Sequence, residues 1–121
     1  MKKLLAVAAF TLVTSFASAQ YKMDSDGKTL RNSSNSSVGR IDSDGKTIRN
    51  SSNSSVGHVD SDGKTIRNSS NSSVLRIDGN DIRNSSNSTI AKMSDVTNDI
   101  KGAKPEAVYV ALWWFIVKGN K

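Results

Sequence analysis

Closely spaced carboxylates beside a glycine recur along the chain, in the arrangement that calcium-binding loops use. Asp-Ser-Asp-Gly occurs three times and a shortened Asp-Gly once, beginning at Asp24, Asp42, Asp60 and Asp78. A calcium loop starting at Asp42 would need an oxygen ligand and a final acidic ligand where the chain has Lys46 and Asn53. These stretches therefore predict turns, and we expect no metal and no other cofactor.

Arginine recurs at fixed distances from these stretches and would supply anion-binding chemistry. Hairpins centred on the glycine turns place Arg40 opposite Arg49 and Arg76 opposite Arg83. Facing cations suit an anionic polymer, lipid headgroup or glycan, whereas aspartates two residues along would neutralise them and leave a solvated face. Both interpretations stay open. The candidate anion-binding residues are Arg31, Arg40, Arg49, Arg67, Arg76 and Arg83.

No catalytic constellation emerges from the sequence. The single histidine, His58, stands where other units carry a basic residue, and the serines belong to repeated Asn/Ser tracts without distinguishing context. Catalysis by a nucleophile needs a base beside it, so we predict that the chain is not an enzyme. The tracts also lack aromatic residues for stacking on bases, and the chain without Lys2 and Lys3 has a net charge of only +4, so nucleic-acid binding is not expected.

The elements that position these residues come from an internal repeat. From Asp24 the chain reads DSDGKTLRNSSNSSVGRI, and two more units of 18 residues and one of 16 follow. Asp44-Gly45 favours a two-residue type I′ hairpin turn, which pairs Ile41 with Ile48. In the short unit Gly79-Asn80 is the turn, in the same register. The 16-residue unit lacks one facing pair of the longer units. Because side chains alternate between the two faces of a strand, the loss of one pair shortens a hairpin without moving any side chain to the other face. The difference in unit length therefore favours hairpins.

A three-sided β-helix is the alternative fold, but the Asn-Ser-Ser-Asn-Ser side of each coil would contain no apolar residue. Each unit offers three apolar residues to a core, as Leu30, Val38 and Ile41 do in the first unit. Val38 and Ile41 are three apart, so the strand must bend or bulge between them, near Gly39. Such a core is thin, and we expect the C-terminal apolar segment or a partner to cover it.

The repeat motif is specific: IRNSSNS recurs at Ile48, Ile66 and Ile82, and LRNSSNS at Leu30. The units resemble those of the four-fold β-flower proteins, small secreted bacterial chains with tandem DG…IRNSSNSTIG units. The resemblance covers roughly residues 21–93 and implies an all-β fold. It implies four tandem β-hairpin repeats around a pseudo-four-fold axis, with an apolar C-terminal segment, helix or strand, packed on it. It brings no assigned activity and no catalytic residues, and Leu75 and Ala91 depart from its expected glycine.

The N-terminus predicts export. Lys2 and Lys3 precede an apolar run over residues 4–16, and residues 17–19 are the small Ala-Ser-Ala of a cleavage site. The run is shorter than the roughly 20 residues of a membrane span. We expect residues 1–19 to be a bacterial-type signal peptide and the mature chain, with a charge of +4, to be periplasmic or extracellular. A lipoprotein anchor is not expected because the chain has no cysteine.

Beyond the repeats the composition changes. Residues 94–104 resemble a polar connector and residues 105–121 an apolar C-terminal segment that contains Trp113, Trp114 and Phe115. A proline opens this segment, as in many helices, but its Val, Tyr, Trp and Ile residues are strand formers, so the element type stays open. A helix here would be roughly 20 Å long, too short to span a bilayer. The three aromatic residues are candidates for hydrophobic contact, within the fold, between copies or with a membrane surface.

The sequence thus predicts a signal peptide (residues 1–19), a four-repeat β-hairpin domain (20–93), a connector (94–104) and an apolar segment (105–121). The predicted function is that of an exported, non-enzymatic β-repeat protein with a structural or interaction role at the cell envelope. Self-association or another envelope component would be its partner. The alternative is a binding module for anionic glycans, polymers or membrane surfaces, through the basic residues and the aromatic tail.

Overall fold

The computed structural model describes residues 20–121, and the predicted signal peptide lies outside them. Nine short strands come first: β1 (Tyr21–Met23), β2 (Thr29–Arg31), β3 (Ser37–Ile41), β4 (Thr47–Asn50), β5 (Ser55–Val59), β6 (Thr65–Asn68), β7 (Ser73–Asp78), β8 (Asp81–Asn84) and β9 (Thr89–Lys92). They are followed by α2 (Met93–Asp99), β10 (Ile100–Lys101), α3 (Ala107–Leu112) and the π-helix η2 (Trp113–Val117). The predicted all-β fold with a packed C-terminal segment is confirmed, and that segment is helical.

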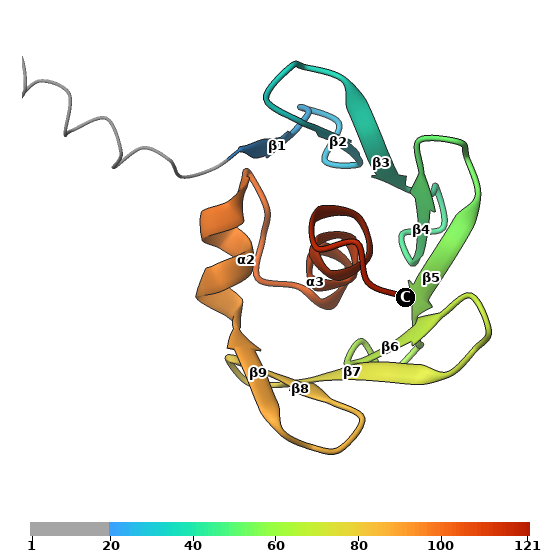
Figure 1. Ribbon diagram of the computed structural model, residues 1–121, viewed down its shortest axis with the longest axis vertical. Helices are drawn as coiled ribbons and strands as arrows, with labels where there is room; N and C mark the ends of the chain where they lie inside the picture. The colour runs from blue at the N-terminus through green and yellow to red at the C-terminus, as the bar shows by residue number, and fades with distance from the viewer. Residues whose placement is uncertain (1–19) are drawn as a thin grey trace, which may run out of the picture.

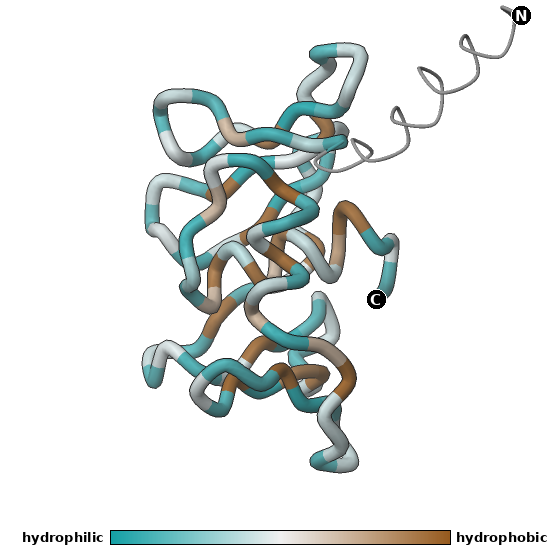
Figure 2. The backbone as a smooth tube through the Cα atoms, turned by 90° about the vertical axis from the view of Figure 1, so that its left-hand side faces the viewer, coloured by the Kyte–Doolittle hydropathy of each residue, from teal (hydrophilic) through white to brown (hydrophobic). Residues whose placement is uncertain are grey.

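The strands form one sheet that curves into a ring. Their order is β10-β1-β2-β3-β4-β5-β6-β7-β8-β9, antiparallel throughout except for the parallel pair of β1 and β10. Figure 1 shows this ring surrounding the orange and red helix of α3 and η2, with α2 in the ring between β9 and β1. In the side view of Figure 2 the hydrophobic stretches lie mostly inside and the hydrophilic ones at the loop ends. The core is therefore the space between the ring and its central helix.

The hairpin register agrees with the sequence prediction. Ile41 pairs with Ile48 in the second hairpin, and the same pairing recurs in the others. In the short fourth hairpin Asp78 pairs with Asp81 across the two-residue turn at Gly79-Asn80. Gly79 has a φ of 62°, as the first central residue of a type II′ turn requires.

The turns of the long hairpins differ from the predicted type. Gly45 has a φ of 74°, and its N–H donates to Asp42 O at 2.9 Å, but Asp44 has no positive φ. The predicted type I′ turn at Asp44-Gly45 is therefore wrong. Asp44 Oδ1 accepts the backbone N–H groups of Lys46 and Thr47 at 2.8 and 2.9 Å. Because this side chain bonds the backbone ahead of it, the loop closes over four residues.

A β-bulge supplies the predicted bend in β3. Arg31 pairs with Ser37 and Leu30 with Gly39, so Val38 is the extra residue of the bulge. The same shift recurs in β5, β7 and β9. As a result Gly39 faces the core, Val38 is half-buried, and the equivalent Ile90 is 40% exposed. The expectation that the Val38 position contributes fully to the core is therefore wrong.

Five pairs of apolar residues line the inside of the ring, where the sequence predicted four repeats. Met93 and Ile100, both buried, are seven residues apart, as Ile41 and Ile48 are. In the fifth unit α2 replaces the hairpin turn, and residues 94–104, predicted as a connector, contain all of α2 but its first residue, and β10. The five pairs are Met23 with Leu30, Ile41 with Ile48, Val59 with Ile66, Ile77 with Ile82, and Met93 with Ile100.

The C-terminal segment fills the centre of the ring. Val110, Ala111 and Leu112 of α3 are fully buried. A Cβ added to Gly57 would lie 2.3 Å from Phe115 Cε2, so the ring residue must be a glycine where the central helix comes close. Across residues 20–121 the structure has no helix long and apolar enough to span a membrane.

Candidate functional site

The arginines of one row on the outer face are bound within their own hairpins. Arg49 Nε donates to Asp42 Oδ2 at 2.9 Å, and its Nη1 donates to Asn53 O at 3.0 Å. The guanidinium group of Arg49 thus connects the start of the glycine turn to the Asn/Ser loop. Equivalent arginine–aspartate pairs are Arg31 with Asp24 (2.9 Å), Arg67 with Asp60 (2.8 Å) and Arg83 with Asp78 (3.3 Å). This geometry is the neutralised arrangement that the sequence left as one of two interpretations.

The facing row of cations is less completely paired. Arg40 Nη1 lies 3.0 Å from Asp42 Oδ1, and His58 Nε2 lies 3.6 Å from Asp60 Oδ1. Arg76 is exposed and makes no ion pair with any residue in 20–121. The outer face therefore retains free positive charge at Arg76.

Three of the ion-paired groups, Asp42, Arg31 and Asp81, have a shifted pKa. The hydrogen bond from Arg49 is the largest cause that lowers the pKa of Asp42, and the bond to Asp24 raises the pKa of Arg31. Lys92 likewise lowers the pKa of Asp81. The lowered pKa keeps Asp42 and Asp81 charged at neutral pH, so that they pair with Arg49 and Lys92.

The Asn/Ser tracts form closed, repeated loops. Asn50 Oδ1 accepts the N–H groups of Ser52 and Ser54 at 2.9 and 3.0 Å, and Asn53 has a φ of 66°. The same bonds recur at Asn32, Asn68 and Asn84. The amide oxygen of each first asparagine is thus used inside its loop, and the serines remain exposed.

The aspartates of the glycine turns accept hydrogen bonds from groups within the same turns. Hydrogen bonds from the side chain of Thr47 and from two backbone N–H groups lower the pKa of Asp44 to about 2. Backbone N–H groups, with that of Lys64 first, do the same for Asp62, again to about 2. No cluster of three or more metal-binding side chains occurs in residues 20–121.

The aromatic residues of the tail belong to the core. Trp113 is 5% exposed and Phe115 6%, so these two side chains make hydrophobic contacts within the fold, one of the alternatives that the sequence left open. Trp114 is half-buried, and its Nε1 is buried without a hydrogen-bond partner in residues 20–121. The π-helical turn of η2, a rare conformation found frequently at functional sites, presents Trp113 and Trp114 together.

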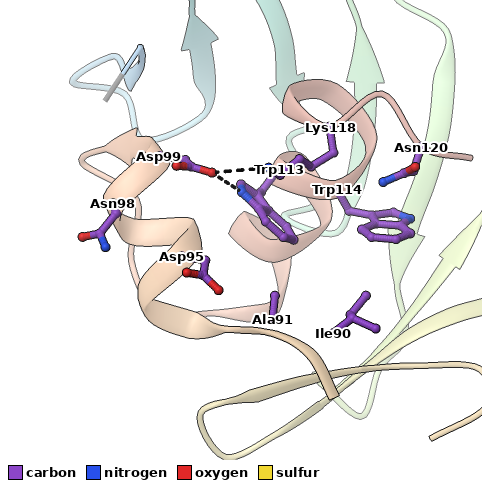
Figure 3. Close-up of a pocket in the computed structure, with 9 residues that line it drawn as sticks. All are labelled: Ile90, Ala91, Asp95, Asn98, Asp99, Trp113, Trp114, Lys118 and Asn120. Carbon is purple, nitrogen blue, oxygen red and sulfur yellow. Dashed lines mark hydrogen bonds and ion pairs between the residues drawn. The ribbon is translucent and has the colours of Figure 1, made fainter. Parts of the chain in front are cut away.

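A cavity of about 610 Å³ lies beside these tryptophans, between η2, α2 and β9 (Figure 3). Its size is within the range of pockets that hold small molecules. Trp113 Nε1 donates to Asp99 Oδ2 at 2.8 Å on its wall. Lys118 Nζ lies 3.9 Å from Asp99 Oδ2 and 5.3 Å from the centre of the Trp113 ring. The lining residues are Ile90, Ala91, Asp95, Asn98, Asp99, Trp113, Trp114, Lys118 and Asn120.

Sequence reasoning found two of these residues, Trp113 and Trp114, and missed the cavity. The others come from a strand, a supposed connector and the last residues of the chain, so no local motif unites them. The spacing of Met93 and Ile100, equal to that of Ile41 and Ile48, was a usable signal for a fifth unit without a hairpin turn.

Repeated hairpins that close around a central helix define a β-flower type of repeat protein. The model of a protein family described as "5-fold beta-flower protein" matches residues 14–115, and the chain belongs to this β-flower family. The predicted four-fold symmetry is thereby corrected to five-fold, in agreement with the five inward pairs. Comparison with curated proteins gives no match, and comparison with solved structures gives none either.

Proposed function

We propose that the chain is a non-enzymatic interaction module of the bacterial cell envelope. The observation that carries this proposal is the use of reactive side chains for structure. Aspartates, arginines and asparagines of each unit bond one another, as Arg49 does with Asp42 and Asn53. What remains outside is an array of hydrogen-bonded loops with exposed serines, which suits binding or scaffolding.

The N-terminal sequence supports an envelope location, and export can be tested directly. The full chain, produced in a Gram-negative host, is expected in the periplasmic fraction, with Gln20 as its first residue by N-terminal sequencing. Leu5→Arg places a charge in the apolar run and is expected to keep the chain in the cytoplasm. Cytoplasmic retention of the unmodified chain would contradict the envelope role.

Envelope interaction is tested on the mature chain, residues 20–121. It is expected to co-sediment with purified cell walls or outer-membrane vesicles above the level of an unrelated protein of similar charge. If the mature chain stays in the supernatant with cell walls and also with outer-membrane vesicles, the interaction role is refuted.

Anionic polymers are a second candidate ligand, favoured by the exposed Arg76, which makes no ion pair within residues 20–121. Dextran sulfate is expected to raise the melting temperature of the mature chain at low salt, and neutral dextran is not. Arg76→Gln is expected to reduce the rise in melting temperature by about half. Lys104→Gln, which removes another exposed cation, is expected to reduce this rise less than Arg76→Gln does. Equal shifts in the two variants would show net-charge attraction without a defined site.

A further inference from the structure

The cavity beside η2 lies where the repeat departs from its symmetry. In the other four units the inward residues pair within a ladder, as Ile41 does with Ile48. In the fifth unit Met93 and Ile100 are joined by α2, and β9 and β10 are the two ends of the strand order. The helix stands in place of a hairpin, and the cavity is found between it and the central helix (Figure 3).

One wall of the cavity already holds an ammonium group. Asp99 accepts the indole N–H of Trp113 at 2.8 Å, and Lys118 Nζ lies 3.9 Å from Asp99. The same Nζ is 5.3 Å from the centre of the Trp113 ring, within the range of a cation–π interaction. A carboxylate and an indole thus bind one cation, which the chain itself supplies.

The cavity has a second carboxylate and a second indole. Asp95 lies four residues before Asp99 on α2, so the two carboxylates share a face of this helix. Asp95 Oδ2 accepts the N–H of Lys92 at 2.9 Å, and Asp95 makes no ion pair with residues 20–121. Trp114 lies on the opposite side, above the exposed Ile90 (Figure 3).

We propose that this cavity binds a small organic cation, with its ammonium group at Asp95 and its apolar body between Trp114 and Ile90. Two carboxylates against one lysine give the cavity a net negative charge in a chain that is positive overall. A volume of about 610 Å³ accommodates more than an ammonium ion, which is why the ligand class includes an apolar body. The site does not depend on export or on envelope binding, so those tests and this one can fail separately.

Tryptophan fluorescence reports directly on this site, because the chain has two tryptophans and both line the cavity. The mature chain is titrated with 2-phenylethylamine, with 2-phenylethanol as its neutral analogue and with phenylacetate as its anionic one. We expect a saturable fluorescence change with the amine at a Kd on the order of 1 mM. The alcohol is expected to bind at least about fivefold more weakly, and the anion to give no saturable change.

Asp95→Asn tests the placement of the ammonium group. Asparagine keeps an oxygen for the Lys92 N–H but removes the charge, and we expect amine binding to weaken at least about fivefold. Asp44→Asn removes the same charge at an exposed turn outside the cavity and is expected to leave binding unchanged. If Asp95→Asn does not fold, the comparison of amine with alcohol on the unmodified chain still decides. Equal affinity for both, or no saturable change with either, would overturn the proposal, as would unaltered binding by a folded Asp95→Asn.

Discussion

Gly57 and Leu75 occupy equivalent positions after the bulge and face the same central helix. At Gly57 a Cβ would lie 2.3 Å from Phe115 Cε2 and 2.6 Å from Arg67 O. Leu75 instead is 1% exposed and fills the space that the central helix leaves on its side of the ring. The same position of the repeat thus holds a buried leucine in β7 and requires a glycine in β5.

Gly57→Ala is expected to destabilise the fold by about 1–3 kcal/mol, because an aromatic ring and a backbone carbonyl must both move. Gly39→Ala is the matched control, since its nearest contact is the Ile116 side chain at 2.9 Å, and its cost should be smaller. Chemical denaturation of both variants measures the difference. Equal effects would show that Phe115 does not set the requirement at Gly57.

The turn aspartates give the fold a dependence on acid. The pKa of both Asp44 and Asp62 is lowered from 3.8 to about 2, so their contribution to stability is present above the unfolded pKa of 3.8. It is lost as the pH falls through about 2. The double variant Asp44→Asn, Asp62→Asn keeps the amide acceptors and should lose stability less steeply than the natural chain over this range. Denaturant midpoints measured from pH 5 to 2 test this, and an identical slope would count against it.

At the scale of elements, the repeated hairpins were predictable and the central helix was not. The 16-residue unit fixed the register, because only one register keeps Ile77 opposite Ile82 and Ile41 opposite Ile48. The tail left its element type open because β-branched and aromatic residues prefer strands. Burial against the ring overrides that preference, since Val110, Ala111 and Leu112 of the tail are fully buried there.

Elements that break the repeat could not be derived from it. The turn type was wrong because the Asp44 side chain, not its backbone, closes the loop. The helix α2 was missed because residues 94–104 are polar and short, and only Val96 and Ile100 are fully buried within it and β10. The cavity was missed because it needs the spatial meeting of β9, α2 and η2, which no sequence spacing encodes.

The central helix should carry much of the stability. Leu112→Ala removes a fully buried side chain and is expected to cost about 2–5 kcal/mol. Ile90→Ala removes an apolar side chain that is 40% exposed and should cost about 0.5 kcal/mol or less. The two free energies of unfolding, measured side by side in urea, should differ several-fold. Similar values would mean that the tail is not a core element.

At the scale of the molecule, the ring and its centre depend on each other. The inward residues of the hairpins and the buried residues of α3 and η2 belong to one hydrophobic core. Tyr109 Oη also donates to Gly27 O at 2.9 Å, which ties the central helix to the first turn. The fold is therefore expected to form as one cooperative unit, and no single hairpin is expected to fold alone.

The most direct test of this interdependence is equilibrium unfolding of residues 20–121, followed by two probes on the same samples. Tryptophan fluorescence reports on the centre, through Trp113 and Trp114, and far-UV circular dichroism reports mainly on the strands. We predict a single urea transition with coincident midpoints for the two probes. Loss of the tryptophan signal at a lower urea concentration, with the strand signal intact, would show that the ring stands without its central helix and would contradict the account.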